Sequence, residues 1–70
     1  MMTKQSVINQ ISKYNIDVNK TMNDLEEALS NKNISFNNII AVITYNRESE
    51  MEFSLVTTPS HDIHIKSKKL

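Results

Sequence analysis

Residues 38–45 read Asn-Ile-Ile-Ala-Val-Ile-Thr-Tyr, an uncharged run that is rich in β-branched residues and ends in an aromatic one. Such residues are typical of β-strands. A strand that is apolar on both faces lies inside a sheet, with each face at least partly covered. This stretch therefore predicts the central strand of a small sheet.

The residues that follow predict two further strands. Apolar and polar residues alternate over residues 51–57, which indicates a strand with one apolar face and one mostly polar face. Pro59 interrupts this pattern. Residues 61–66 alternate again and predict a third strand, with Ile63 and Ile65 on the same face.

Two helices are expected before the sheet. Apolar residues at helical spacing predict a helix over residues 4–13, with Thr3 as its N-cap. Residues 21–24 resemble a capping box, and the apolar residues after them recur at three- and four-residue steps. A second helix is therefore predicted over residues 22–30.

The short segment between the two helices is open to two interpretations. Residues 14–18 alternate apolar and polar, which favours a strand, but a continuation of the first helix is the alternative. With the strand, the chain has an α+β fold of order α-β-α-β-β-β, in which two helices pack on a small antiparallel sheet.

Length and composition limit the possible functions. Seventy residues make a single domain, residues 1–70. Without glycine the chain has no glycine-rich phosphate loop, and without cysteine it has no thiolate nucleophile and no zinc knuckle. We therefore expect no cofactor. The nine asparagines are expected to replace glycine in turns, because Asn tolerates the left-handed region of backbone space.

The sequence also favours a cytoplasmic protein that does not contact membranes. The first residues lack the apolar run of a secretion signal, and the longest apolar run, residues 39–43, is too short to span a bilayer. The absence of cysteine fits a reducing compartment.

The net charge of zero hides an uneven distribution. Residues 17–62 contain eight acidic and three basic side chains, whereas both ends are basic. An acidic body of this kind is compatible with ordinary solvated surface or with a face that binds a basic partner. Its most prominent members are Asp17, Asp24 and Glu27, one on the predicted short strand and two on the second helix.

The basic C-terminus, residues 66–70, is expected to be a flexible tail. It contains three lysines but no aromatic residue on which a base could stack, so we expect no direct nucleic-acid binding. Weak binding through the lysines is the alternative.

Candidate catalytic residues are few. Ser60, His61 and Asp62 are the residue types of a nucleophilic triad, but neighbours on a strand point apart and cannot form one. His61 and His64 are expected on opposite faces, which disfavours a shared metal ion. We therefore expect no metal site and no enzymatic activity.

Two segments carry a resemblance to a known family. Residues 25–31, Leu-Glu-Glu-Ala-Leu-Ser-Asn, resemble Val-Glu-Glu-Val-Ile-Gly-Asn in the second helix of the phage-encoded uracil-DNA glycosylase inhibitors. Residues 45–57 also match that family in a tyrosine, an acidic turn and a closing Leu-Val-Thr. The resemblance covers about residues 14–58 and implies a fold of helix, edge strand, helix and antiparallel sheet.

The resemblance implies a binding mode as well. In that family an acidic edge strand enters the DNA cleft of the glycosylase, and a cavity between the second helix and the sheet encloses an apolar side chain of the enzyme. Asp17 would take the place of the edge-strand glutamate, and Asp24 and Glu27 match acidic helix positions. The residues that match cavity-lining positions are Leu25, Ala28, Leu29, Ala41 and Val56.

Two functions from different classes are thus predicted. The first is a non-enzymatic inhibitor that binds uracil-DNA glycosylase as a DNA mimic, through an acidic edge and an apolar pocket. The alternative is a small homo-oligomeric or regulatory module, in which residues 39–43 and a sheet edge pair between copies.

Overall fold

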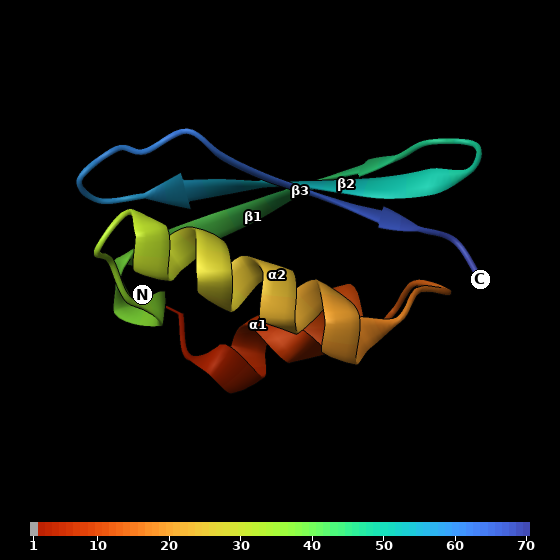
Figure 1. Cartoon of the computed structure of the whole chain (residues 1–70), viewed down its shortest axis with the longest axis horizontal. Helices are drawn as coiled ribbons and strands as arrows, with labels where there is room; N and C mark the ends of the chain where they lie inside the picture. The colour runs from red at the N-terminus through yellow and green to blue at the C-terminus, as the bar shows by residue number, and fades with distance from the viewer. Residues whose placement is uncertain (1) are drawn as a thin grey trace.

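A computed structural model of the chain describes residues 2–70. Over these residues two helices precede a three-stranded antiparallel sheet, with a short 3₁₀ helix between them (Figure 1). The elements are α1 (Lys4–Ile11), α2 (Val18–Asn31), η1 (Phe36–Asn38), β1 (Ile39–Asn46), β2 (Glu50–Thr57) and β3 (Ile63–Lys68). The predicted α+β class, with two helices and an antiparallel sheet, is confirmed.

Helix α1 begins as predicted at a Thr3 N-cap. The Thr3 hydroxyl accepts the backbone N–H of Ser6, and the Ser6 side chain accepts the backbone N–H of Thr3 in return. The helix ends at Ile11, two residues earlier than predicted. Val7 and Ile11 on its inner side are buried.

The predicted strand over residues 14–18 is wrong, and so is its alternative of a longer first helix. The chain turns after α1, and Ile16 forms only an isolated bridge with Lys69. Asp17 then caps α2, because its carboxylate accepts the backbone N–H of Lys20. Helix α2 therefore begins four residues earlier than predicted, and Thr21, expected as the cap, lies buried inside the helix.

Helix α2 ends in a Schellman motif built on asparagine. The N–H of Ile34 donates to the carbonyl of Leu29, and the N–H of Asn33 donates to that of Ser30. Asn33 has φ 62°, in the left-handed region where glycine is usual. The expectation that Asn replaces glycine is confirmed at this turn.

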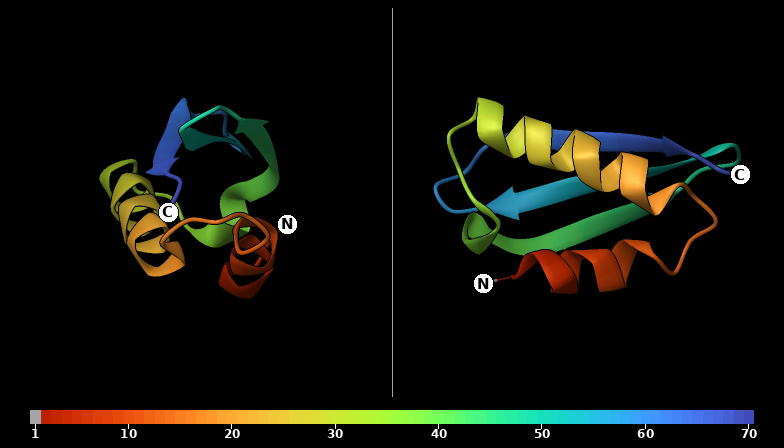
Figure 2. Two further views of the ribbon diagram at one scale, coloured as in Figure 1. Left: turned by 90° about the vertical axis from the view of Figure 1, so that its right-hand side faces the viewer. Right: turned by 60° about the horizontal axis from the view of Figure 1, so that its bottom comes forward.

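The two helices cover one face of the sheet (Figure 2). The buried residues of β2 and β3 alternate as predicted and point toward the helices. They meet Val7 and Ile11 of α1 and Leu25 and Leu29 of α2 in one core. The strand residues of this core are Ile39, Met51, Phe53, Leu55, Ile63 and Ile65.

Strand β1 is an edge strand, not the predicted central one. The strand order is β1-β2-β3, so the central strand is β2. The face of the sheet away from the helices has no covering element among residues 2–70, as Figure 2 shows. Apolar residues of β1 are therefore exposed, with Ile40 at 50% and Ile43 at 44% of full accessibility.

The predicted flexible tail is also wrong for residues 66–68, which belong to β3. Ser67 is buried and lies opposite Met51 of β2. Beyond the strand, the N–H of Leu70 donates to the carbonyl of Asn15, and the Asn15 amide donates back to Leu70. The C-terminus is thus attached to the loop between the helices, and the alternation of buried and exposed residues in β3 continues to Lys68.

Within residues 2–70 no helix is both long enough and apolar enough to cross a membrane.

Candidate protein-binding surfaces

Two of the three predicted acidic residues lie in one groove between α2 and β3. Asp17 at the start of α2 and Asp24, two turns later, both line this groove, which has a volume of about 530 Å³. Glu27 is exposed but is not among the residues that line the groove. The structure therefore brings Asp17 and Asp24 together and places Glu27 beyond them on the helix.

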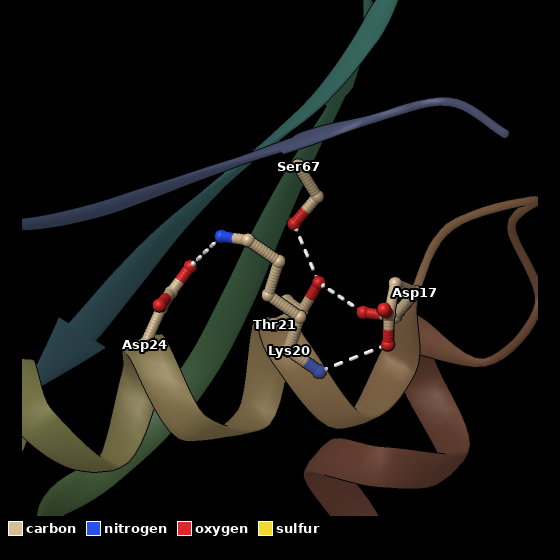
Figure 3. A network of polar contacts seen from close by, with 5 residues as sticks. All are labelled: Asp17, Lys20, Thr21, Asp24 and Ser67. Atoms are coloured by element: carbon tan, nitrogen blue, oxygen red, sulfur yellow. Dashed lines mark hydrogen bonds and ion pairs between the residues drawn. The ribbon is translucent and has the colours of Figure 1, made fainter.

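The groove is balanced in charge. Its acidic side chains are Asp17, Asp24 and Glu50, and its basic side chains are Lys20, Lys66 and Lys68. Lys20 forms an ion pair with Asp24, with 3.2 Å between the ammonium nitrogen and a carboxylate oxygen (Figure 3). The acidic body seen in the sequence does not become a purely acidic surface here, because β3 contributes two lysines.

A buried pair of hydroxyls ties the helix to the strand beside this groove (Figure 3). The Thr21 hydroxyl donates to the backbone carbonyl of Asp17 at 2.8 Å. Its oxygen lies 2.6 Å from that of Ser67, so with its one proton already used it accepts from Ser67. Both side chains are buried, and the pair holds α2 against β3 at this point.

The structure does not bring the five predicted pocket residues together. Leu25 and Leu29 are buried on the inner side of α2, where Ala28 is partly buried against the same core. Ala41 and Val56 are cross-strand neighbours on the opposite, open face of the sheet. The sheet thus separates the two groups.

The cavity that residues 2–70 form between the helices and the sheet is too small for an inserted side chain. The space there is about 10 Å³ and is lined by core residues that include Leu25 and Phe53. A cavity of about 10–15 Å³ holds only a single water molecule. The apolar pocket expected between α2 and the sheet is therefore already filled by the protein's own core.

The open face of the sheet is an apolar surface that the sequence indicated only in part, through the alternative in which residues 39–43 pair between copies. We call its apolar residues, together with Ile40 at the strand edge, the β1 patch: Ile40, Ala41, Ile43, Tyr45 and Val56, all of them exposed. The Arg47 guanidinium lies 5.2 Å from the centroid of the Tyr45 ring, a cation–π contact at one end of the patch.

Beyond the β1 patch, the open face holds two cross-strand pairs of opposite charge. In the register of β2 with β3, Glu50 lies opposite Lys68, and Glu52 lies opposite Lys66. The open face therefore runs from an apolar strand through an acidic row to a basic row. One feature of the sequence could have revealed this face: the two predicted helices are enough to cover one face of a sheet and leave the other face open.

Among the residues considered for catalysis, the Asp62 carboxylate contacts the exposed ring of His64. Over residues 2–70 no three His, Asp or Glu side chains lie close enough to hold a metal ion together.

Comparisons of the chain with models of protein families, with curated proteins and with solved structures found no match.

Proposed function

We propose that this protein is a non-catalytic binding module that contacts another protein chain through the β1 patch and the free edge of β1. One observation carries the proposal: β1 is an edge strand of eight residues without a charged residue, and it adjoins exposed apolar side chains. Native proteins protect such edges with lysines, prolines, β-bulges or covering elements. Strand β1 has a bulge between Ile39 and Ala41, but residues 41–46 contain no lysine, proline or bulge and mark a place where another strand can pair.

The chemistry of this surface fits strand addition. Backbone groups along β1 supply hydrogen bonds to an incoming extended segment, and alternate side chains of that segment lie on the open face. Ile43 and Tyr45 would provide the apolar centre of such an interface, and Arg47 its polar border. Large apolar side chains at the centre of an interface contribute most of the binding energy.

The test compares two substitutions of exposed apolar residues. Ile43→Lys places a charge in the patch, whereas Leu70→Lys changes a residue that is 78% exposed and lies outside it. Each purified variant, carrying a tag, is immobilised and exposed to a bacterial lysate that also contains the untagged protein. We expect the wild type and Leu70→Lys to retain the same proteins and Ile43→Lys to lose them. Identical binding by all three would overturn the proposal.

A second candidate is inhibition of a uracil-DNA glycosylase, as the family resemblance implies. The observation that favours it is the position of Asp17, Asp24 and Glu27, which follow one another along the outer side of α2 at steps of seven and three residues. In this chain the carboxylates of α2, without an acidic edge strand, would have to occupy the DNA cleft.

This second candidate is tested by measuring uracil release from DNA by the glycosylase. Inhibition at micromolar protein that disappears with Asp24→Lys and Glu27→Lys together would support it. Full glycosylase activity at these concentrations would exclude it.

A further inference from the structure

The free part of the β1 edge has definite limits. At its beginning, the carbonyl of Ile39 already accepts the backbone N–H of Met2. At its end, the N–H of Arg47 donates to Glu50 in the turn to β2. The stretch that is free to pair with another strand is therefore residues 40–46.

The hydrogen bond at Arg47 also determines which backbone groups point outward. In an antiparallel pair, successive residues direct their N–H and C=O groups alternately toward and away from the partner strand. Since Arg47 bonds toward β2, Tyr45 and Ile43 do so as well. Val42 and Thr44 therefore direct their N–H and C=O groups out of the sheet.

We propose that the partner of this edge is a second copy of the same chain, paired antiparallel through β1 about a two-fold axis at Ile43. This inference rests on the proposed function and names its partner. The product is a six-stranded sheet, in which the two β1 strands lie at the centre and the helices of both copies cover the same face.

The register follows from the limits of the free edge. Residues 40–46 are centred on Ile43, so a two-fold axis there pairs the whole free stretch with itself. Val42 then lies opposite Thr44 of the second copy, and both have outward backbone groups, as a hydrogen-bonded pair requires. Ile40 lies at the β-bulge between Ile39 and Ala41, so the regular pairs in this register are those of residues 41–45, which are also centred on Ile43.

The side chains on the open face agree with this register. Ile43 meets Ile43 of the second copy in a non-hydrogen-bonded pair, where side chains lie closest. Tyr45 meets the small Ala41 of the second copy, so a large side chain faces a small one. With the axis at Thr44 instead, Ala41 would face the charged Arg47.

No charge opposes this pairing. The stretch 39–46 is uncharged, and in this register Arg47 and Glu48 of one copy lie beyond the paired residues, at the level of Ile39, whose outward carbonyl is bonded to Met2. Like charges opposite one another, which destabilise paired strands, are therefore avoided. This is why the second copy is favoured as the partner over a charged segment of another protein.

The absence of cysteine makes the register directly testable. In Ile43→Cys the two introduced cysteines would lie about 4.5 Å apart between their Cα atoms, within the range a disulfide bridges. The matched control is Ser54→Cys, on the neighbouring strand opposite Ile43. Its two copies would lie three strand spacings apart, about 14 Å, which is too far. We expect Ile43→Cys to form a disulfide dimer under mild oxidation and Ser54→Cys to stay monomeric.

Sedimentation measures the dimer without a cross-link. The wild type and Leu70→Lys are expected to shift from monomer to dimer over a concentration series that reaches millimolar, and Ile43→Lys is expected to stay monomeric. Thr44→Pro removes only an outward N–H and, since edge strands tolerate proline, should fold and stay monomeric too. Circular dichroism checks that each variant is folded.

Several results would overturn the second copy as partner. These are a wild-type monomer at every concentration, a dimer that Ile43→Lys and Thr44→Pro leave intact, or equal cross-linking of Ile43→Cys and Ser54→Cys. If the wild type is monomeric but Ile43→Lys still loses proteins retained from the lysate, the second-copy proposal fails and the binding module stands. If Ile43→Lys changes neither the oligomeric state nor the set of proteins retained from the lysate, both proposals fail.

Discussion

The buried hydrogen bonds of Thr21 can be tested by substitution. Its hydroxyl donates to Asp17 and accepts from Ser67. Thr21→Val keeps the shape of the side chain but leaves the buried Ser67 hydroxyl without an acceptor. We expect a loss of about 1–3 kcal/mol in the free energy of unfolding, measured by urea denaturation.

The double variant Thr21→Val with Ser67→Ala distinguishes the loss of this hydrogen bond from a general disturbance of the core. Ser67→Ala leaves Thr21 bonded to Asp17 and should cost less than Thr21→Val. When both are changed, no hydroxyl remains unpaired, so the double variant should be more stable than the sum of the two single effects predicts. Strict additivity would contradict the hydrogen bond between the two side chains.

Asn33 offers a second test, on the backbone. Its φ of 62° suits glycine, and is costly for a residue whose side chain cannot form local hydrogen bonds. Asn33→Ala should lower the free energy of unfolding by about 1–2 kcal/mol. Asn33→Gly should leave it unchanged or raise it, as measured by the urea midpoint.

The control for this prediction is Asn31→Ala, at the last position of α2, where the backbone is helical. Because alanine has a higher helix propensity than asparagine, this substitution should not destabilise the protein. An equal loss at both positions would show that the amide side chains, and not the backbone conformation, matter.

Single residues also show what the sequence can and cannot predict. Thr3 was predicted as an N-cap because the hydrogen bonds of that cap involve only residues that are close in sequence. Asp17 was not, because the alternation over residues 14–18 favours a strand, with a longer first helix as the alternative, whereas the structure has neither and starts α2 after Asp17. Thr21 of this helix contacts Ser67 of β3, a contact that the local sequence does not show. Local pattern fails where tertiary contacts choose the helix start.

At the scale of elements, strand β3 gives the clearest prediction. A chain ending at Ile65 loses half of β3, uncovers the fully buried Met51 and removes the contact of Leu70 with Asn15. Small domains have only about 0.05–0.15 kcal/mol of stability per residue. We therefore expect this shortened chain to lose its cooperative unfolding transition, followed by circular dichroism on heating.

A substitution that keeps the strand provides the control. Lys66→Ala with Lys68→Ala removes two exposed charges but leaves the backbone of β3 in place. This variant should unfold within about 1 kcal/mol of the wild type. If the shortened chain were as stable as this variant, residues 66–70 would behave as the flexible tail that their composition predicts.

The three strands differ in how well the sequence predicts them. For β2, alternation of apolar and polar residues predicted the buried face correctly, since that pattern depends on one face only. For β1, the position in the sheet was wrong. A strand that is apolar on both faces is typical of a central strand, but it is equally suited to an edge that is covered by another chain. The sequence of one copy does not distinguish the two.

The candidate site residues also differ in how well the sequence predicts them. Exposure of Asp17 and Glu27 was predictable, because they are charged and occupy polar positions. The assembly of a pocket was not, because it required Ala41 and Val56 to share a face with Leu29, and the face of each strand residue is set by its register. Only the pairing of β1 with β2 places them on the open side.

At the scale of the whole molecule, size limits how the second copy binds. The protein exposes 4506 Å² of accessible surface, close to the value of about 4,500 Å² expected for a compact monomer of its mass. A standard interface takes about 800 Å² from each partner, nearly a fifth of this surface. Pairing of one strand edge and its patch belongs to the smaller, weaker class of interfaces.

A weak dimer makes thermal stability depend on protein concentration. Above the dissociation constant, each tenfold rise in concentration stabilises the folded chain by about 0.7 kcal/mol, half of the free energy of a tenfold change in an equilibrium constant. For a domain of this size that raises the melting temperature by roughly 3–6 °C. Calorimetry of the wild type should therefore show this rise over the tenfold range above the dissociation constant measured by sedimentation, whereas Ile43→Lys should melt at one temperature throughout. A wild-type melting temperature independent of concentration would mean that the uncharged edge of β1 stays unpaired in solution.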